Sequence, residues 1–118
     1  MIEEVTTIYH EEKNSQDALI NVPHDNYGFD ILIEKYSNRE DFDSLIIEVF
    51  QEADETKQIM RFKYKECINS TARISGYFSI PVNKGFKPPF LIRISPDVLD
   101  VEMEDFSFIV TPKDLLVK

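Results

Sequence analysis

The sequence is poor in the residues that build disulfide-linked, metal-bound or phosphate-cradling folds. Its 118 residues include one cysteine, Cys67, and three glycines. A lone cysteine excludes an intramolecular disulfide framework and any multi-cysteine zinc or iron–sulfur site, and it fits a reducing compartment. No glycine-rich phosphate loop is present. We therefore expect no cofactor.

Long apolar runs are also missing. No stretch approaches the roughly 20 apolar residues that a membrane helix needs. The first four residues, Met1 to Glu4, carry acids where a secretory signal would carry Lys or Arg. We expect a cytoplasmic protein with no membrane contact. Isoleucine, lysine, aspartate, asparagine and glutamate are plentiful while glycine and alanine are scarce, a balance that indicates AT-rich coding DNA and hence a bacterial or phage source.

Catalytic and metal-binding patterns are absent as well. His24-Asp25 is the nearest thing to a catalytic dyad, but the pair lies in a polar loop where such composition is ordinary. His10-Glu11-Glu12 and the acids near the C-terminus match neither the EF-hand order of ligands nor a zinc spacing. The sequence predicts a protein that is not an enzyme and holds no metal.

Apolar residues are sufficient for a packed core. They make up 42% of the chain, with 9 Phe and 5 Tyr, and we expect one domain over residues 1–118. In many segments apolar residues alternate with other residues, as at Phe29, Ile31 and Ile33, and turn-forming segments separate seven or eight such runs. This pattern predicts a single antiparallel all-β domain. The preferred fold is an OB-like barrel, and a β-sandwich is the alternative.

Charge is unevenly distributed along the chain. Residues 61–93 carry seven Lys or Arg and one acid, a net charge of +6 inside a protein of net charge −9. Residues 1–60 carry 15 acids and 4 bases, a net charge of −11. Segregated charge predicts a bipolar surface, and a bipolar surface indicates a binding partner.

The basic segment supplies the candidate site. We expect three of its strands to pair as an antiparallel meander whose outer face gathers the cations, with a tyrosine among them and a phenylalanine on the adjacent loop. Cations beside exposed rings are typical of single-stranded nucleic-acid sites, because the charges follow the phosphates and the rings stack on bases. The candidate nucleic-acid-binding residues are Arg61, Lys63, Lys65, Arg73, Tyr77, Lys84, Phe86, Lys87 and Arg93.

Two other interpretations of these residues stay open. Outward Lys and Arg on amphipathic strands can simply be a solvated face. Phe86, in the loop Lys84 to Pro89, can fold back and plug one end of the domain instead of stacking on a base.

The sequence thus predicts a non-enzymatic binding protein for single-stranded nucleic acid, in particular single-stranded DNA. The alternative is a protein-interaction module: a phage-type inhibitor or DNA mimic that uses the acidic surface, or an accessory subunit of a virion or other assembly. Unpaired strand edges also make a homodimer a reasonable expectation.

Overall fold

A computed structural model describes residues 3–23, 26–35, 42–68, 77–83, 85–97 and 101–115, and of residues 35, 42, 43, 65–68, 77 and 78 it describes the backbone alone. Within these ranges the chain forms strands β1 (Val5–Thr6), β2 (Ile8–His10), β3 (Ser15–Ile20), β4 (Tyr27–Lys35), β5 (Phe42–Phe50), β6 (Gln58–Ile68), β7 (Tyr77–Pro81), β8 (Phe90–Pro96) and β9 (Ser107–Asp114), and 3₁₀ helices η1 (Glu11–Lys13) and η2 (Met103–Asp105). No helix in these ranges is long and apolar enough to cross a membrane.

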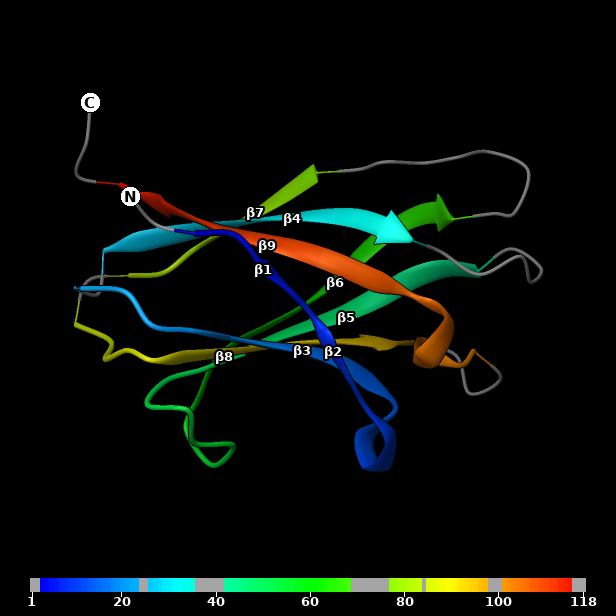
Figure 1. The fold of residues 1–118 in the computed structure, drawn as a ribbon, viewed down its shortest axis with the longest axis horizontal. Helices are drawn as coiled ribbons and strands as arrows, with labels where there is room; N and C mark the ends of the chain where they lie inside the picture. The colour runs from blue at the N-terminus through cyan, green and yellow to red at the C-terminus, as the bar shows by residue number, and fades with distance from the viewer. Residues whose placement is uncertain are drawn as a thin grey trace.

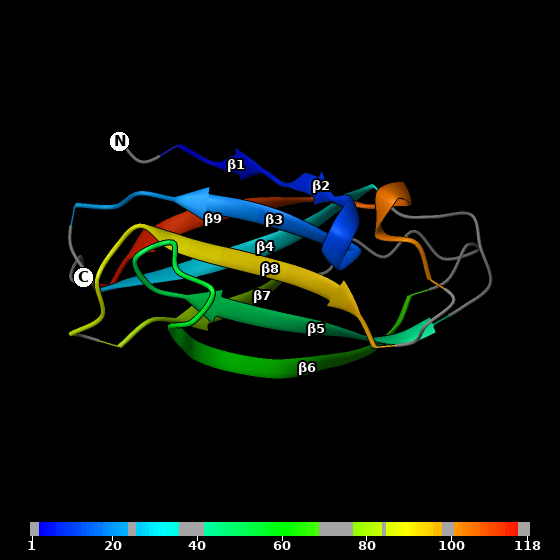
Figure 2. The same cartoon turned by 90° about the horizontal axis from the view of Figure 1, so that it is seen from below.

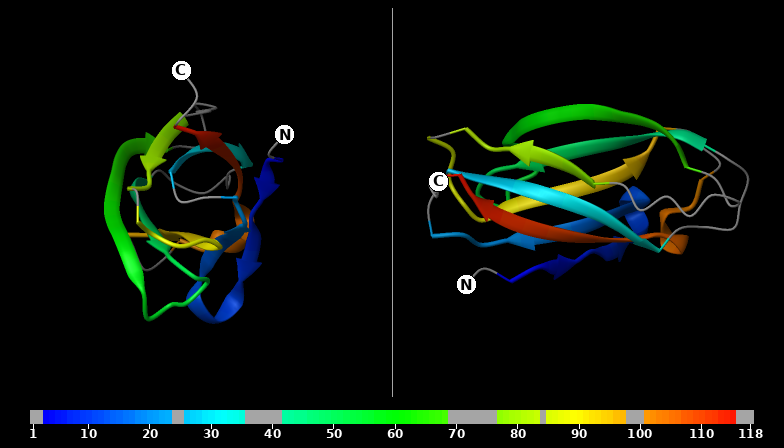
Figure 3. Two further views of the ribbon diagram at one scale, coloured as in Figure 1. Left: turned by 90° about the vertical axis from the view of Figure 1, so that its left-hand side faces the viewer. Right: turned by 90° about the horizontal axis from the view of Figure 1, so that it is seen from above.

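The strands form two antiparallel sheets that pack against each other as a β-sandwich (Figure 1). One sheet has the order β1-β9-β4-β7 and the other has the order β2-β3-β8-β5-β6. The right-hand view of Figure 3 places β4 and β9 in front of the five-stranded sheet. The prediction of an all-β domain is confirmed. The sheets do not close into the preferred OB-like barrel, so the sandwich alternative is the one that fits.

Alternation along the strands explains the core between the two sheets. Phe29 and Ile31 of β4 and Phe108 of β9 face the interior from one sheet, and Ile47 of β5 and Ile92 of β8 face it from the other, all with 0% exposure. Such period-2 burial is expected of sheets that are packed on one face. The expected inward set of β4, with Phe29 and Ile31, is therefore confirmed.

Aromatic rings join the two layers directly. The ring of Phe29 in β4 lies 5.7 Å from that of Phe90 in β8, with an interplanar angle of 65°. This edge-to-face arrangement is the favoured geometry of an aromatic pair. Since the two strands belong to different sheets, the contact is part of what holds the sandwich together.

A buried polar network fixes the point where the chain passes from one sheet to the other. Thr7, between β1 and β2, donates from Oγ1 to Gln16 Oε1 at 2.9 Å and accepts from the Phe108 amide at 3.0 Å. Gln16 Nε2 donates in turn to the Met103 carbonyl at 2.8 Å. Asn14 accepts from the Met103 amide and donates to the Val101 carbonyl, both at 2.8 Å. Buried polar groups need partners, and here the side chains find them in one another and in backbone amides and carbonyls.

The outer face of the five-stranded sheet is flanked by two projecting loops. Figure 2 shows β3, β8, β5 and β6 side by side, with the β5–β6 hairpin loop at one end and η1 beside β3. In Figure 1 both loops extend away from the sandwich on the side of this sheet. Both loops therefore lie on the same side of the molecule as the outer face of this sheet.

Candidate functional site

One row of charged residues crosses the outer face of the five-stranded sheet. The register pairs Arg61 of β6 with Glu48 of β5, and Glu48 with Arg93 of β8. Arg93 is paired in turn with Asp17 of β3. Directly opposed residues of antiparallel strands share a face, so cation and acid alternate along these four positions. We call this set the cross-strand charge row.

Arg93 is the most enclosed member of the row, with 7% exposure. Its Nε donates to Asp17 Oδ1 at 3.1 Å, its Nη2 lies 2.9 Å from Asp17 Oδ2, and its guanidinium carbon lies 5.6 Å from the centre of the Phe50 ring. Nη2 also meets Glu55 Oε1 at 2.5 Å. The hydrogen bond to Asp17 raises the pKa of Arg93 above its ordinary value; burial opposes the rise and Glu55 adds to it. Arg93 is thus a buried, paired cation held in one orientation.

Glu55 reaches Arg93 because the β5–β6 hairpin loop has a defined shape. Asp54 Oδ1 accepts from the Thr56 amide at 2.8 Å and from the Thr56 hydroxyl at 2.6 Å, and these bonds lower the pKa of Asp54. Glu52 and Ala53 adopt left-handed backbone conformations, with φ of 56° and 53°. β5 and β6 pair as a hairpin around this turn.

A second set of bonds anchors this loop to the chain before β8. The amide of Glu52 donates to the Lys87 carbonyl at 2.9 Å, and the amide of Ala53 donates to the Pro89 carbonyl at 2.8 Å. Gln51 Oε1 accepts from the Lys87 amide at 3.2 Å. These contacts hold the hairpin loop in addition to the ion pair between Glu55 and Arg93.

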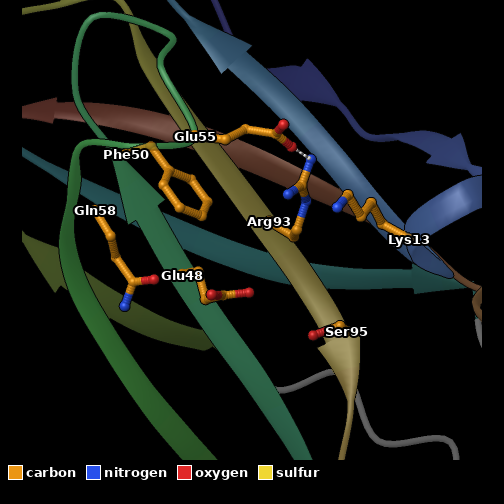
Figure 4. A pocket seen from close by; sticks show the side chains of 7 residues that line it. All are labelled: Lys13, Glu48, Phe50, Glu55, Gln58, Arg93 and Ser95. Atoms are coloured by element: carbon orange, nitrogen blue, oxygen red, sulfur yellow. Dashed lines mark ion pairs between the residues drawn. The ribbon is translucent and has the colours of Figure 1, made fainter.

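A pocket of about 320 Å³ opens between the hairpin loop and η1 (Figure 4). Its lining residues are Lys13, Glu48, Phe50, Glu55, Gln58, Arg93 and Ser95. In Figure 4 the side chain of Lys13 points toward Arg93 and Glu55 from the opposite rim. The volume lies at the small end of the range for small-molecule sites. We call it the outer pocket.

The expected meander of three basic strands is wrong. β6 and β8 lie in the five-stranded sheet with β5 between them, and β7 lies in the four-stranded sheet beside β4. Tyr77 of β7 is paired in register with Leu32, in a different sheet from the cations of β6. The register accounts for this: β6 pairs along its length with β5, and all five residues of β7 pair with β4.

The candidate residues consequently separate into groups. Arg61 and Lys63 are exposed on the outer face of β6, as expected, and Lys87 is exposed before β8. Lys63 lies 3.3 Å from Asp97, whose pKa is lowered first by a hydrogen bond from Ser44 and then by Lys63. Arg93 faces outward, as expected, and there it is paired with Asp17 and Glu55.

Four candidates are described partly or not at all. Arg73 and Lys84 lie outside the described residues. Lys65 occupies the position in β6 opposite Ser44, and Tyr77 the position in β7 opposite Leu32; both are described as backbone only.

Phe86 is half-buried and packs against the hydrophobic core. This placement favours the interpretation in which the ring closes one end of the domain over that in which it stacks on a base. The neighbouring Lys87 is exposed, so the loop turns its aromatic residue inward and its cation outward.

We expect Phe86→Ala to lower the free energy of unfolding by about 1–3 kcal/mol, since it removes a half-buried ring from the core margin. Urea unfolding checks this, with Lys87→Ala as the control for the loop, expected to change stability by less than about 0.5 kcal/mol. If Phe86→Ala leaves the free energy of unfolding unchanged but weakens oligonucleotide binding, this interpretation is contradicted. Phe86 would then be a residue that contacts the ligand.

Sequence reasoning missed most of the outer pocket. Glu55 and Lys13 reach the pocket, and Asp17 reaches Arg93, from segments that only the strand order brings together. The one available signal was the turn at Asp54 to Thr56, which places Glu55 on a projecting loop without saying what it touches.

Comparisons with models of protein families, with curated proteins and with solved structures found no match. In the described part of the chain, no group of three or more His, Cys, Asp or Glu side chains gathers to hold a metal ion. The geometry of the site offers paired charges, a pocket and, in β6, the last strand of the five-stranded sheet.

Proposed function

We propose that the protein is a non-enzymatic binding protein for single-stranded nucleic acid, with β6 as its docking strand. The observation that carries the proposal is the position of Arg61 and Lys63. Both are exposed, on the same face of a strand that ends the five-stranded sheet. We propose the cytoplasm of a bacterial or phage-infected cell as its location.

The spacing of these cations suits an extended polyanion. Arg61 and Lys63 are two residues apart, which corresponds to about 6.8 Å along a strand. This interval is comparable with the distance between successive phosphates of an extended nucleic-acid strand. Lys65 continues the sequence of alternate cations along β6. A single strand lying along this edge would therefore meet one cation for each phosphate.

Acids beside the cations limit the expected affinity. Arg61 is opposite Glu48 in the register, and Lys63 is paired with Asp97. A phosphate has to compete with these carboxylates, and Arg93 is already occupied by Asp17 and Glu55. We expect two or three phosphate contacts, and hence a slope of log affinity against log salt of about −1.5 to −2.

The double variant Arg61→Glu/Lys63→Glu tests the proposal. We expect at least about tenfold weaker binding to a mixed-sequence single-stranded DNA oligonucleotide, because two attractive contacts become repulsive. Fluorescence anisotropy at about 20–50 mM salt measures the change, at an ionic strength where phosphate contacts are strong.

The matched control is Lys57→Glu/Lys113→Glu, which makes the same change in net charge. Each of these lysines is exposed and already paired with an acid, Glu52 and Asp30 respectively. Equal loss in both double variants would mean that net charge alone governs binding and that β6 is not the docking strand. Wild-type binding weaker than about 100 μM at this salt would reject nucleic acid as the ligand.

A protein partner is the second candidate function, and a separate observation favours it. Ile8 and Leu19 are 76% and 56% exposed, and both lie on the outer face of the five-stranded sheet. Exposed apolar residues grouped on one face are typical of interaction surfaces. A pull-down from nuclease-treated lysate that recovers the same protein with the wild type and with Arg61→Glu/Lys63→Glu would support this function.

A further inference from the structure

The Arg93 guanidinium is an anion receptor fixed in place before any ligand arrives. Asp17 binds it along Nε and Nη2, and the Phe50 ring covers one face. Arg93 is 93% buried by residue surface, because its exposure is 7%. A guanidinium held in this way loses little freedom when a further acceptor binds, which favours association.

Arg93 retains donors beyond those that Asp17 uses. A guanidinium has five N–H groups in a planar fork. Nε and Nη2 contact Asp17 and Glu55, whereas Nη1 has no hydrogen-bond partner among the residues that the structure describes. Arg93 also lines the outer pocket. The donors of Nη1, together with the Nη2 donor that contacts Glu55, therefore form the edge that an acceptor can bind.

Glu55 occupies part of that edge in a way that a ligand can replace. Its side chain is 49% exposed, on the hairpin loop, and Oε1 makes one contact with Arg93 Nη2. The loop keeps its shape through Asp54 and Thr56 and through its backbone bonds to Lys87 and Pro89. Withdrawal of Glu55 would therefore expose the guanidinium without dismantling the loop.

We propose that the outer pocket is a carboxylate-binding site, in which Glu55 stands in for the carboxylate of a small ligand. Both groups that now contact the guanidinium, Asp17 and Glu55, are carboxylates, and their planar oxygens match its fork. Lys13 on the opposite rim adds a second cation. This inference does not depend on nucleic-acid binding, since β6 supplies neither Arg93 nor Glu55.

The pocket also selects among carboxylates. Glu48 lines it together with Arg93, so a second negative group on the ligand would lie near a fixed acid. A monocarboxylate therefore binds better than a dicarboxylate, although the dicarboxylate carries more charge.

Glu55→Ala tests the proposal by removing the internal competitor. Acetate and succinate are titrated at constant ionic strength, and NMR follows the Arg93 Nε–H and the Gln58 side-chain amide, both at the pocket. We expect Glu55→Ala to bind acetate at least about tenfold more tightly than the wild type. We expect succinate to bind more weakly than acetate.

The matched control is Glu52→Ala, which removes one negative charge from the same loop but from a residue that pairs with Lys57. Its affinity for acetate should stay within about twofold of the wild type. Glu55→Gln, which keeps the side-chain length, should show a smaller gain in the same direction. Any of three results would overturn the proposal. The first is that acetate causes no saturable NMR shift in Glu55→Ala, and the second is that Glu55→Ala and Glu52→Ala gain equally in affinity for acetate. The third is a stronger response to inorganic phosphate than to acetate.

Discussion

We expect Arg93→Met to lower the free energy of unfolding by about 3–5 kcal/mol. The substitution keeps most of the aliphatic length but removes the charge. It leaves the Asp17 carboxylate, whose side chain is 14% exposed, without its cation and, among the described residues, with the Ser15 hydroxyl as its hydrogen-bond donor. An uncompensated carboxylate in such a site is the costly outcome of breaking a buried ion pair. Chemical denaturation followed by circular dichroism measures the loss.

Two further variants separate this cause from general disturbance of the sheet. Lys63→Met removes another outward cation of the same sheet, but its ion pair with Asp97 is exposed, with side chains at 45% and 27%. We expect it to cost less than about 1 kcal/mol. Arg93→Met/Asp17→Leu removes both partners and should recover much of the stability lost by the single variant. If the double variant is as unstable as the single one, the unpaired Asp17 is not the cause.

We expect Phe90→Ala to be similarly damaging, with a loss of about 3–5 kcal/mol and a fall in melting temperature of about 10–20 °C. The ring is fully buried and its removal leaves a cavity between the two sheets. Part of the loss, about 0.5–1.5 kcal/mol, comes from the edge-to-face contact with Phe29.

A double-mutant cycle with Phe29→Leu and Phe90→Leu measures that part directly, because leucine retains much of the apolar volume. Coupling between the two positions should appear, since their rings touch across the sandwich. Additive effects would contradict the described packing of β4 against β8.

Local patterns in the sequence predicted which side of a strand each residue takes, but not which strands become neighbours. Arg61 and Lys63 face outward because alternation with Met60 and Phe62 is a property of adjacent residues. The pairing of β8 with both β3 and β5 depends on segments distant in sequence, and the register between them has no local signature. The preference for a barrel was wrong because it concerned which strands become neighbours. The all-β prediction was confirmed because it needed only the local alternation.

Arg93 illustrates the same limit at the candidate site. Alternation correctly places it outward, opposite to Ile92 and Ile94, which are buried. An outward residue is exposed only if nothing covers that face, and here Asp17 and Glu55 do so from β3 and from the hairpin loop. Local periodicity carries no information about such coverage, so the sequence reasoning counted a paired arginine among the free cations.

The position of β6 at the end of its sheet constrains how copies of the protein can associate. A second copy that extended the sheet from β6 about a two-fold axis at Phe62 would bring Arg61 and Lys63 against the same cations of its partner. Like charges directly opposite each other are destabilising, so this arrangement opposes the pairing of β6 with β6 and the growth of fibrils from it. The homodimer expected from the sequence would then use a different edge. Concentrated salt weakens this repulsion between the two β6 strands, because at about 1 M the screening length falls to about 3 Å. At low ionic strength the protein should therefore stay monodisperse, whereas at about 1 M salt β6 should be able to start aggregation.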